Sequence, residues 1–295
     1  MRLPRPARLL VFLILSLPGL AASDVAVRDD YGKVVELQAP ARRIVSLSPH
    51  LTELAYAAGA GTRLVGAIEH SNFPPEARAL PRVGSEAGID LEAVLALRPD
   101  LVIAWPNAGS RKAVERLAGF GVPVFRSEPR ALEDIATTLE RLGALAGTER
   151  TASAAAQAFR ERASALRATY AQRPKVRVFY QVWDRPLVTV NGDHVISKVI
   201  ALCGGANVFA HLPGIAPQID REAVLRADPE AIVASGPDGE RPAWLDAWRS
   251  LPGLQAAARG NLFTIPPELI QRHTPRLLEG AERLCRQLEE VRTRR

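Results

Sequence analysis

The stretch DLEAVLALRPDLVIA, residues 90–104, returns 130 positions later as DREAVLRADPEAIVA, residues 220–234. Seven of the fifteen positions are identical, and the remaining apolar positions mostly stay apolar. Each copy predicts a short helix that begins after an N-cap aspartate, breaks at a proline and leads into a buried strand. One such unit used twice at this distance indicates two similar α/β lobes, because a solenoid would need a shorter period. Two lobes of this kind usually enclose a ligand between them. The alternative to a true repeat is that two unrelated amphipathic helices resemble each other by chance.

The first 23 residues predict a secretory signal peptide. A basic start with three arginines precedes the apolar run Leu9–Leu17, and small residues follow at 21–23. The run is too short for a membrane span, which needs ~20 apolar residues. We expect cleavage near Ala22–Asp24 and a mature protein that is free in the periplasm, because no cysteine follows the run to carry a lipid. The alternative is an ordinary N-terminal helix.

The charge of the mature chain does not indicate a nucleic-acid partner. Without the leader the chain has 35 basic and 32 acidic residues, a formal net charge of +3, and part of this excess lies in the last four residues. A small excess of this kind is typical of a solvated surface.

Apolar runs that alternate with helical patterns predict parallel sheets in two lobes. The expected strands are Arg43–Leu47, Leu64–Ala67, Leu101–Trp105, Val122–Phe125, Val176–Val182, Ile232–Ala234 and Leu262–Ile265. We expect an N-terminal lobe at 24–140, a connecting helix at 141–173 and a C-terminal lobe at 174–295. The connector belongs to an Ala-, Glu- and Arg-rich stretch from Leu132 to Arg173, with a break near Gly143–Gly147. The fold class is therefore α/β, with two Rossmann-like lobes joined by one long rigid helix.

The two cysteines of the chain, Cys203 and Cys285, have 81 residues between them. An even number in an exported chain favours a disulfide. A bridge that closes this span would stabilise the fold by ~4 kcal/mol and fasten a C-terminal helix at Arg276–Val291 to the second lobe. The alternative is two unrelated free thiols. We expect no metal site, because no histidine or second cysteine lies at ligand spacing.

The sequence contains no motif of a catalytic site. The five histidines are dispersed, and neither an HExxH pattern, a nucleophile elbow nor a phosphate-binding loop occurs. We therefore predict no catalytic residue and no cofactor, and a binding protein in place of an enzyme.

Candidate ligand-binding residues follow the carboxyl ends of strands, where α/β sheets bind ligands. They are Pro49, His50, Phe73, Trp105, Trp183, Glu268 and Arg272. Only 5% of residues are aromatic, which makes Trp105 at a strand end suggestive. Packing in the core or at the rim is the alternative for Trp105 and Trp183, and helix capping is the alternative for His50. Glu268 and Arg272 could also form a surface pair.

Several motifs resemble the periplasmic cobalamin-binding proteins of bacterial ABC importers. They are RIVSLSPHLTELAYAAGA, SNFPPEA and LEAVLALRPDLVIAW within 43–105, LCGGANVF at 202–209, QIDREAVL at 218–225 and QRHTPRLLEGAERLC at 271–285. The likeness covers nearly the whole mature chain and keeps the motif order. It implies two α/β lobes joined by one long helix, a disulfide between Cys203 and Cys285, and a shallow cleft that holds a corrinoid ring.

The resemblance also implies roles for individual residues. Pro49, Phe73, Trp105, Glu268 and Arg272 match ligand-contacting positions of that family. We expect the two aromatic rings to form an apolar wall, Pro49 to shape the floor, and Glu268 and Arg272 to hydrogen-bond polar groups at the rim. Where the best-known corrinoid binders carry a tryptophan on each lobe, this chain has Glu86 and Ala216, so that stacking area is lost.

The same class of binding proteins includes receptors for haem and ferric siderophores. His50, His70 or His273 is a candidate axial ligand in a haem or a corrinoid site. Capture of haem or a ferric siderophore is therefore the alternative to corrinoid binding, and a periplasmic enzyme is the alternative from another class.

The repeat also predicts the partner. Glu92 and Glu222 occupy the same place in both copies, two residues after the N-cap. A carboxylate there stabilises the positive helix end by ~0.3–1 kcal/mol, which is the alternative role. The resemblance implies that these glutamates pair with arginines of a homodimeric inner-membrane ABC permease, which works with its ATPase subunits. We expect a monomer that presents both glutamates on the side of the cleft and delivers cobalamin or a related corrinoid to this permease.

Overall fold

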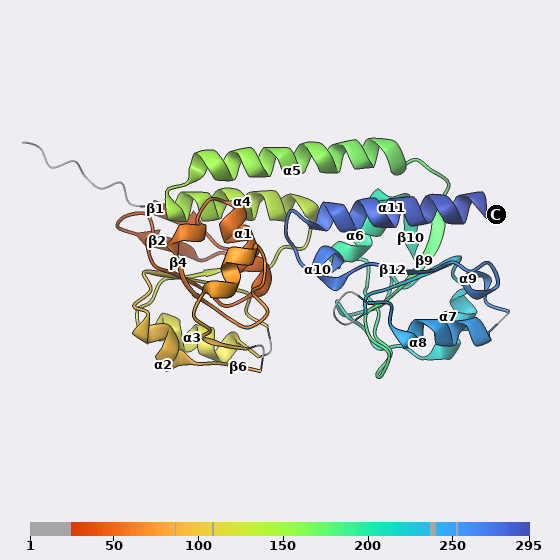
Figure 1. The fold of residues 1–295 in the computed structure, drawn as a ribbon, viewed down its shortest axis with the longest axis horizontal. Coiled ribbons are helices and arrows are strands. Elements are labelled where there is room, and N and C mark those ends of the chain that lie inside the picture. The colour runs from red at the N-terminus through yellow and green to blue at the C-terminus, as the bar shows by residue number, and fades with distance from the viewer. Residues whose placement is uncertain (1–24, 86, 108, 237–239, 252) are drawn as a thin grey trace, which may run out of the picture.

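The computed structural model describes residues 25–295 except 86, 108, 237–239 and 252. Two α/β lobes lie side by side, and the long helix α5 (Glu149–Tyr170) runs across both of them (Figure 1). The expected signal peptide and its cleavage site lie outside the described residues, as does Glu86. Within the described part of the chain, no helix combines the length and the apolar character that a membrane crossing requires.

The N-terminal lobe is built on a parallel four-stranded sheet in the order β4-β3-β7-β8. Its strands are β3 (Ile44–Ser46), β4 (Leu64–Ala67), β7 (Leu101–Ala104) and β8 (Val124–Arg126). Two antiparallel pairs accompany it, β1 (Val25–Arg28) with β2 (Val34–Leu37) and β5 (Gly84–Ser85) with β6 (Gly88–Ile89). The helices are α1 (Pro49–Ala57), α2 (Leu91–Ala96), α3 (Arg111–Gly119) and α4 (Leu132–Ala146). The central strand β7 is buried along its whole length because helices cover both faces of the sheet.

The C-terminal lobe repeats this topology. Its parallel sheet has the order β10-β9-β11-β12. The strands are β9 (Val176–Gln181), β10 (Gly205–Asn207), β11 (Ala231–Ala234) and β12 (Leu262–Thr264). The helices are α6 (Val195–Leu202), α7 (Arg221–Ala227), α8 (Ala243–Asp246), α9 (Gln255–Ala258), α10 (Pro267–Ile270) and α11 (Leu277–Thr293). In both sheets the first strand lies between the second and the third, which confirms the prediction of two similar α/β lobes.

The two copies of the repeat have the same local structure. Asp90 caps α2 by accepting a hydrogen bond from the backbone N–H of Ala93 at 3.0 Å. Asp220 caps α7 in the same way, with the N–H of Ala223 at 2.6 Å. Each cap satisfies a backbone donor that has no partner within its own helix. The expected N-caps are therefore confirmed in both lobes.

The exits from the two helices are also alike. Arg98 and Asp228 have positive φ angles of 46° and 40°, and each directly precedes a proline. A residue before proline disfavours the right-handed helical region, so the helix ends here and the chain turns into the strand. The following strands, β7 and β11, hold the same third position in their sheets.

The long Ala-, Glu- and Arg-rich stretch forms two antiparallel helices, α4 and α5, which lie side by side (Figure 1). The chain reverses at Gly147, whose φ of 65° is left-handed and ends α4. The helices approach closely at Gly143, where a Cβ atom would lie 2.3 Å from the Cβ of Ala152. The helix that connects the lobes is therefore α5 alone, and residues 141–146 belong to α4.

The C-terminal helix α11 is fastened to the second lobe by a disulfide between Cys203 and Cys285. Cys203 follows α6 directly, and Cys285 lies on the buried face of α11. The Arg162 guanidinium on α5 also donates to the Glu282 carboxylate on α11 at 2.7 Å. The pairing of the two cysteines confirms the expected bridge.

Candidate functional site

A cavity of about 680 Å³ lies between the two lobes. The N-terminal lobe lines it with residues that follow β3, β4 and β7: Ser48, Pro49, His50, His70, Asn72, Phe73, Arg78 and Trp105. The C-terminal lobe lines it with residues that follow β12: Pro267, Glu268, Gln271, Arg272 and Arg276. All four strands are parallel strands of their sheets, so the cavity lies at the carboxyl ends where such sheets place their ligand sites.

The structure brings together six of the seven candidate ligand-binding residues in this cavity: Pro49, His50, Phe73, Trp105, Glu268 and Arg272. Trp183 does not line it. That side chain is 55% exposed, and its indole N–H donates to the carbonyl of Arg185 at 3.1 Å. The chain bends back after β9 to form an antiparallel bridge between Trp183 and Val188, so Trp183 belongs to this turn and is not among the lining residues.

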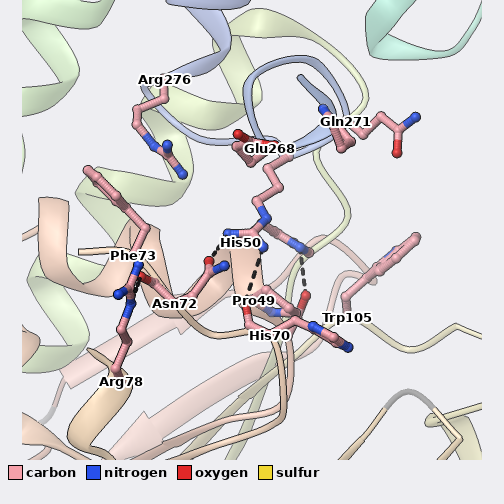
Figure 2. Close-up of a pocket in the computed structure, with 13 residues that line it drawn as sticks. Pro49, His50, His70, Asn72, Phe73, Arg78, Trp105, Glu268, Gln271 and Arg276 are labelled. Carbon is pink, nitrogen blue, oxygen red and sulfur yellow. Dashed lines mark hydrogen bonds between the residues drawn. The ribbon is translucent and has the colours of Figure 1, made fainter. Parts of the chain in front are cut away.

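Two aromatic rings stand on opposite sides of the cavity (Figure 2). The Phe73 side chain is 36% exposed, and the Arg276 guanidinium lies 3.7 Å from the centre of its ring. The Trp105 indole is partly buried and packs against the His50 ring in a T-shaped arrangement, with ring centres 5.7 Å apart. Each aromatic side chain can therefore offer apolar area to a flat ligand while its other side is held by a neighbour.

Local structure explains the position of Pro49. Ser48 is extended and Pro49 occupies the first position of α1, where the missing N–H costs no helical hydrogen bond. The helix therefore begins at the cavity, and His50 follows as the second helical residue.

Arg276 crosses from the C-terminal to the N-terminal lobe. Its guanidinium donates two hydrogen bonds of 2.8 Å to the carboxylate of Glu53 on α1. The Glu53 side chain is only 3% exposed, and its hydrogen bonds raise the pKa of Arg276 above the ordinary value. A bidentate pair between a buried carboxylate and an arginine fixes both partners in one geometry. Sequence reasoning missed this pair, although a glutamate within the apolar stretch LTELAYAAGA was a signal that a partner was needed.

Arg272 makes a second connection between the lobes. Its guanidinium donates to the Asn72 side-chain oxygen at 2.8 Å and to the carbonyl of His70 at 3.1 Å, both visible as dashed lines in Figure 2. The hydrogen bonds of Arg272 thus link the two lobes beside the cavity.

Three histidines form a row where the lobes meet. His50 is the second residue of α1, His194 caps α6 by accepting from the N–H of Ile196 at 3.1 Å, and His273 follows α10. The ring centres of His50 and His273 are 5.8 Å apart, and those of His273 and His194 are 6.1 Å apart. Sequence reasoning treated His50 and His273 as separate candidates and did not anticipate their contact.

Burial keeps this row uncharged. It holds the pKa of His50 well below the ordinary value, and nearby His273 and Arg272 lower it further. Burial also lowers the pKa of His194 to about 4. The pKa of His273 falls to about 4 for the same reason, although Asp134 and Glu128 oppose the change. All three rings are therefore neutral near pH 7.

The candidate axial ligands differ in their access to the cavity. His50 Nδ1 lies 2.6 Å from the Ser48 hydroxyl, and its Nε2 is buried without a hydrogen-bond partner among the described residues. His273 is not among the lining residues, whereas His70 lines the cavity and is exposed. The described residues contain no group of three or more histidines, cysteines or acids that could hold a metal ion. Ala216 is exposed and does not line the cavity.

A model of the periplasmic binding protein family matches residues 44–269. The chain belongs to this family. A vitamin B12-binding protein of Vibrio parahaemolyticus is 39% identical over 260 residues, which cover 87% of this chain and 92% of that protein. The expected relation to this group of periplasmic binding proteins is thereby confirmed.

Solved structures of other periplasmic binding proteins share the two-lobed fold. The periplasmic vitamin B12 binding protein BtuF of Vibrio cholerae matches with a TM-score of 0.78 and 35% identity, over 86% of this chain and 98% of that chain. A periplasmic haem-binding protein from Pseudomonas aeruginosa matches with a TM-score of 0.72 and 29% identity, over 83% of this chain and 91% of that chain. The fold class, with two α/β lobes and one long connecting helix, is confirmed.

The neutral histidine row predicts a loss of stability in acid. In the unfolded chain these rings bind protons near pH ~6.5. In the folded chain His194 and His273 stay neutral to about pH 4, and burial also holds the pKa of His50 well below its ordinary value. The neutral histidines therefore make their full contribution to the free energy of unfolding above pH ~6.5. This contribution is lost as the pH falls toward 4, by up to ~1.4 kcal/mol per pH unit for each histidine. Urea unfolding between pH 7 and 4 measures this dependence.

A matched pair of variants isolates the row from the acid sensitivity of carboxylates. The His273→Gln variant should lose less stability between pH 6.5 and 4 than the wild type. The His211→Gln variant, which changes an exposed histidine outside the row, should follow the wild-type profile. Parallel profiles for His273→Gln and wild type would contradict the interpretation.

Proposed function

We propose that this periplasmic binding protein captures cobalamin or a related corrinoid in the cavity between its lobes and delivers it to an ABC importer. The observation that carries the proposal is the pair of aromatic side chains, Phe73 and Trp105, on opposite sides of one interlobe cavity. It occurs in a chain that matches a vitamin B12-binding protein over 87% of its length. Aromatic side chains suit a flat macrocycle, because they can contact it in offset stacked or edge-to-face geometry.

Polar residues at the rim support a ligand with amide side chains. Glu268 and Gln271 come from the C-terminal lobe, and Asn72 faces them from the N-terminal lobe (Figure 2). Together they offer both donors and acceptors, which is what the neutral amides around a corrin ring require. Rim contacts of this kind orient the ligand, while the apolar walls contribute most of the affinity.

Haem and a corrinoid make different demands on the histidines of the cavity. Protein-bound haem takes an axial ligand from the protein, such as histidine, cysteinate or tyrosinate. His50 and His70 both line the cavity; the Nε2 atom of His50 is buried, whereas His70 is exposed and open to a ligand. Cobalamin carries axial ligands of its own, so it needs no such group from the chain.

Calorimetric titration of the mature protein with cyanocobalamin, haemin and a ferric siderophore tests the ligand directly. We expect cyanocobalamin to bind most tightly. Cyanocobalamin affinity weaker than ~10 μM, which corresponds to about −7 kcal/mol, beside tight haemin binding would overturn the assignment.

The Trp105→Ala variant should weaken cyanocobalamin binding by ~2–4 kcal/mol, because a central aromatic anchor carries much of the binding energy. Trp183→Ala is the matched control, since that indole lies outside the cavity and should not affect affinity. Calorimetry measures both. Unchanged affinity in Trp105→Ala together with lower thermal stability would assign Trp105 to packing alone.

Delivery to the importer is assigned to Glu92 and Glu222. Both side chains are exposed, and neither has an ion pair or hydrogen bond to another side chain within the described part of the molecule. Their helices, α2 and α7, both lie on the side of the molecule opposite α5 (Figure 1). Two unpaired carboxylates at equivalent places suit a permease dimer that presents one basic site per subunit.

The double variant Glu92→Arg/Glu222→Arg should keep its cyanocobalamin affinity and lose corrinoid uptake, because arginine would face the basic sites of the permease. Uptake by cells and calorimetry measure the two effects. Glu149→Arg is the control: Glu149 is also an exposed acid in the first turn of a helix, but it lies on α5. Normal uptake by the double variant would leave Glu92 and Glu222 only a role at the helix ends.

A further inference from the structure

The helices α2 and α7 expose a leucine at equivalent positions. Leu95 is 37% exposed and Leu225 is 41% exposed. Each follows its glutamate by three residues, so the two side chains are neighbours on the outer face of the helix. The inner face of each helix is occupied by a valine, Val94 or Val224, with no exposed area. Both lobes therefore present a carboxylate and an apolar side chain together.

The need for a folded helix does not explain this arrangement. A single exposed leucine is ordinary on a protein surface. Other outward positions of the two copies differ in character, since Ala96 corresponds to Arg226. The leucine is present in both copies although it contributes little to the core of either lobe.

An apolar neighbour changes what a surface carboxylate can do. An exposed ion pair is worth only ~0–1 kcal/mol, because water screens it. When apolar side chains exclude water from the contact, the same pair becomes stronger and more selective. A leucine beside each docking glutamate supplies such a side chain in each lobe.

We propose that Leu95 and Leu225 are part of the surface that docks on the permease, and that each enters an apolar depression beside the basic group that receives the neighbouring glutamate. This inference rests on the proposed delivery of ligand to an ABC importer. The partner is a two-fold dimer that carries this depression once on each subunit, because the leucines and glutamates repeat at equivalent positions in the two lobes. Neither helix lines the cavity, so the contact is separate from ligand binding.

The variant Leu95→Ser/Leu225→Ser tests the proposal. Its dissociation constant for cyanocobalamin should stay within twofold of the wild type. Its affinity for the cognate permease–ATPase complex in lipid nanodiscs should fall at least tenfold, and each single variant should lose a similar part of this effect. The variant Leu95→Met/Leu225→Met, which keeps an apolar side chain, should dock nearly as well as the wild type.

Val34→Ser is the matched control, because Val34 is 38% exposed and lies on β2, away from α2 and α7 (Figure 1). It should dock like the wild type. Wild-type docking by the double serine variant would overturn the proposal, and so would an effect confined to one leucine. A wild-type dimer that the double variant converts to a monomer in sedimentation would also overturn it, because the leucines would then join two copies of this chain. If the wild type binds no cyanocobalamin and the double serine variant still loses docking, the result would support the docking surface and refute the proposed ligand.

Discussion

The geometry of the cavity depends on one ion pair between the lobes. Glu53 is buried in α1, and Arg276 reaches it from the start of α11 with two hydrogen bonds of 2.8 Å. Removing one partner of such a pair leaves an uncompensated buried charge and costs ~3–5 kcal/mol. The same guanidinium covers the ring of Phe73, so the pair positions an aromatic wall as well as the two lobes. A ligand that touches Phe73 therefore depends on Glu53, a residue that does not itself line the cavity.

The row of neutral histidines has a complementary effect at the same boundary. Because burial lowers the pKa of His194 and His273 to about 4, these histidines add no positive charge where the lobes meet near pH 7. Aromatic edges and faces then pack as they would in an apolar core. Charge at this boundary is concentrated in Arg272 and Arg276, both of which donate to groups of the opposite lobe.

Local sequence patterns predicted much of the fold, because the N-cap aspartates, the prolines and the apolar runs set the starts and ends of helices and strands through interactions that span only a few residues. They also placed Trp105 and Phe73 after strands of the same parallel sheet, whose carboxyl ends meet at one edge. The pair of Glu53 and Arg276 could not be predicted in this way, because 223 positions separate its partners. The position of Trp183 depends on a turn that the local sequence pattern does not specify. The sequence also leaves open whether the chain reverses at Gly143 or at Gly147.

The connecting helix limits how far the shape of the protein can change when a ligand binds. Since α5 extends across both lobes and packs against α4 and α11, a closing motion would have to bend a helix of 22 residues or break its contacts. The loaded and empty forms then present nearly the same outer shape. Under the proposed delivery to an ABC importer, a transporter that distinguishes the two forms would have to sense the cargo itself through the open side of the cavity. Empty copies would then compete with loaded ones for the same membrane complex.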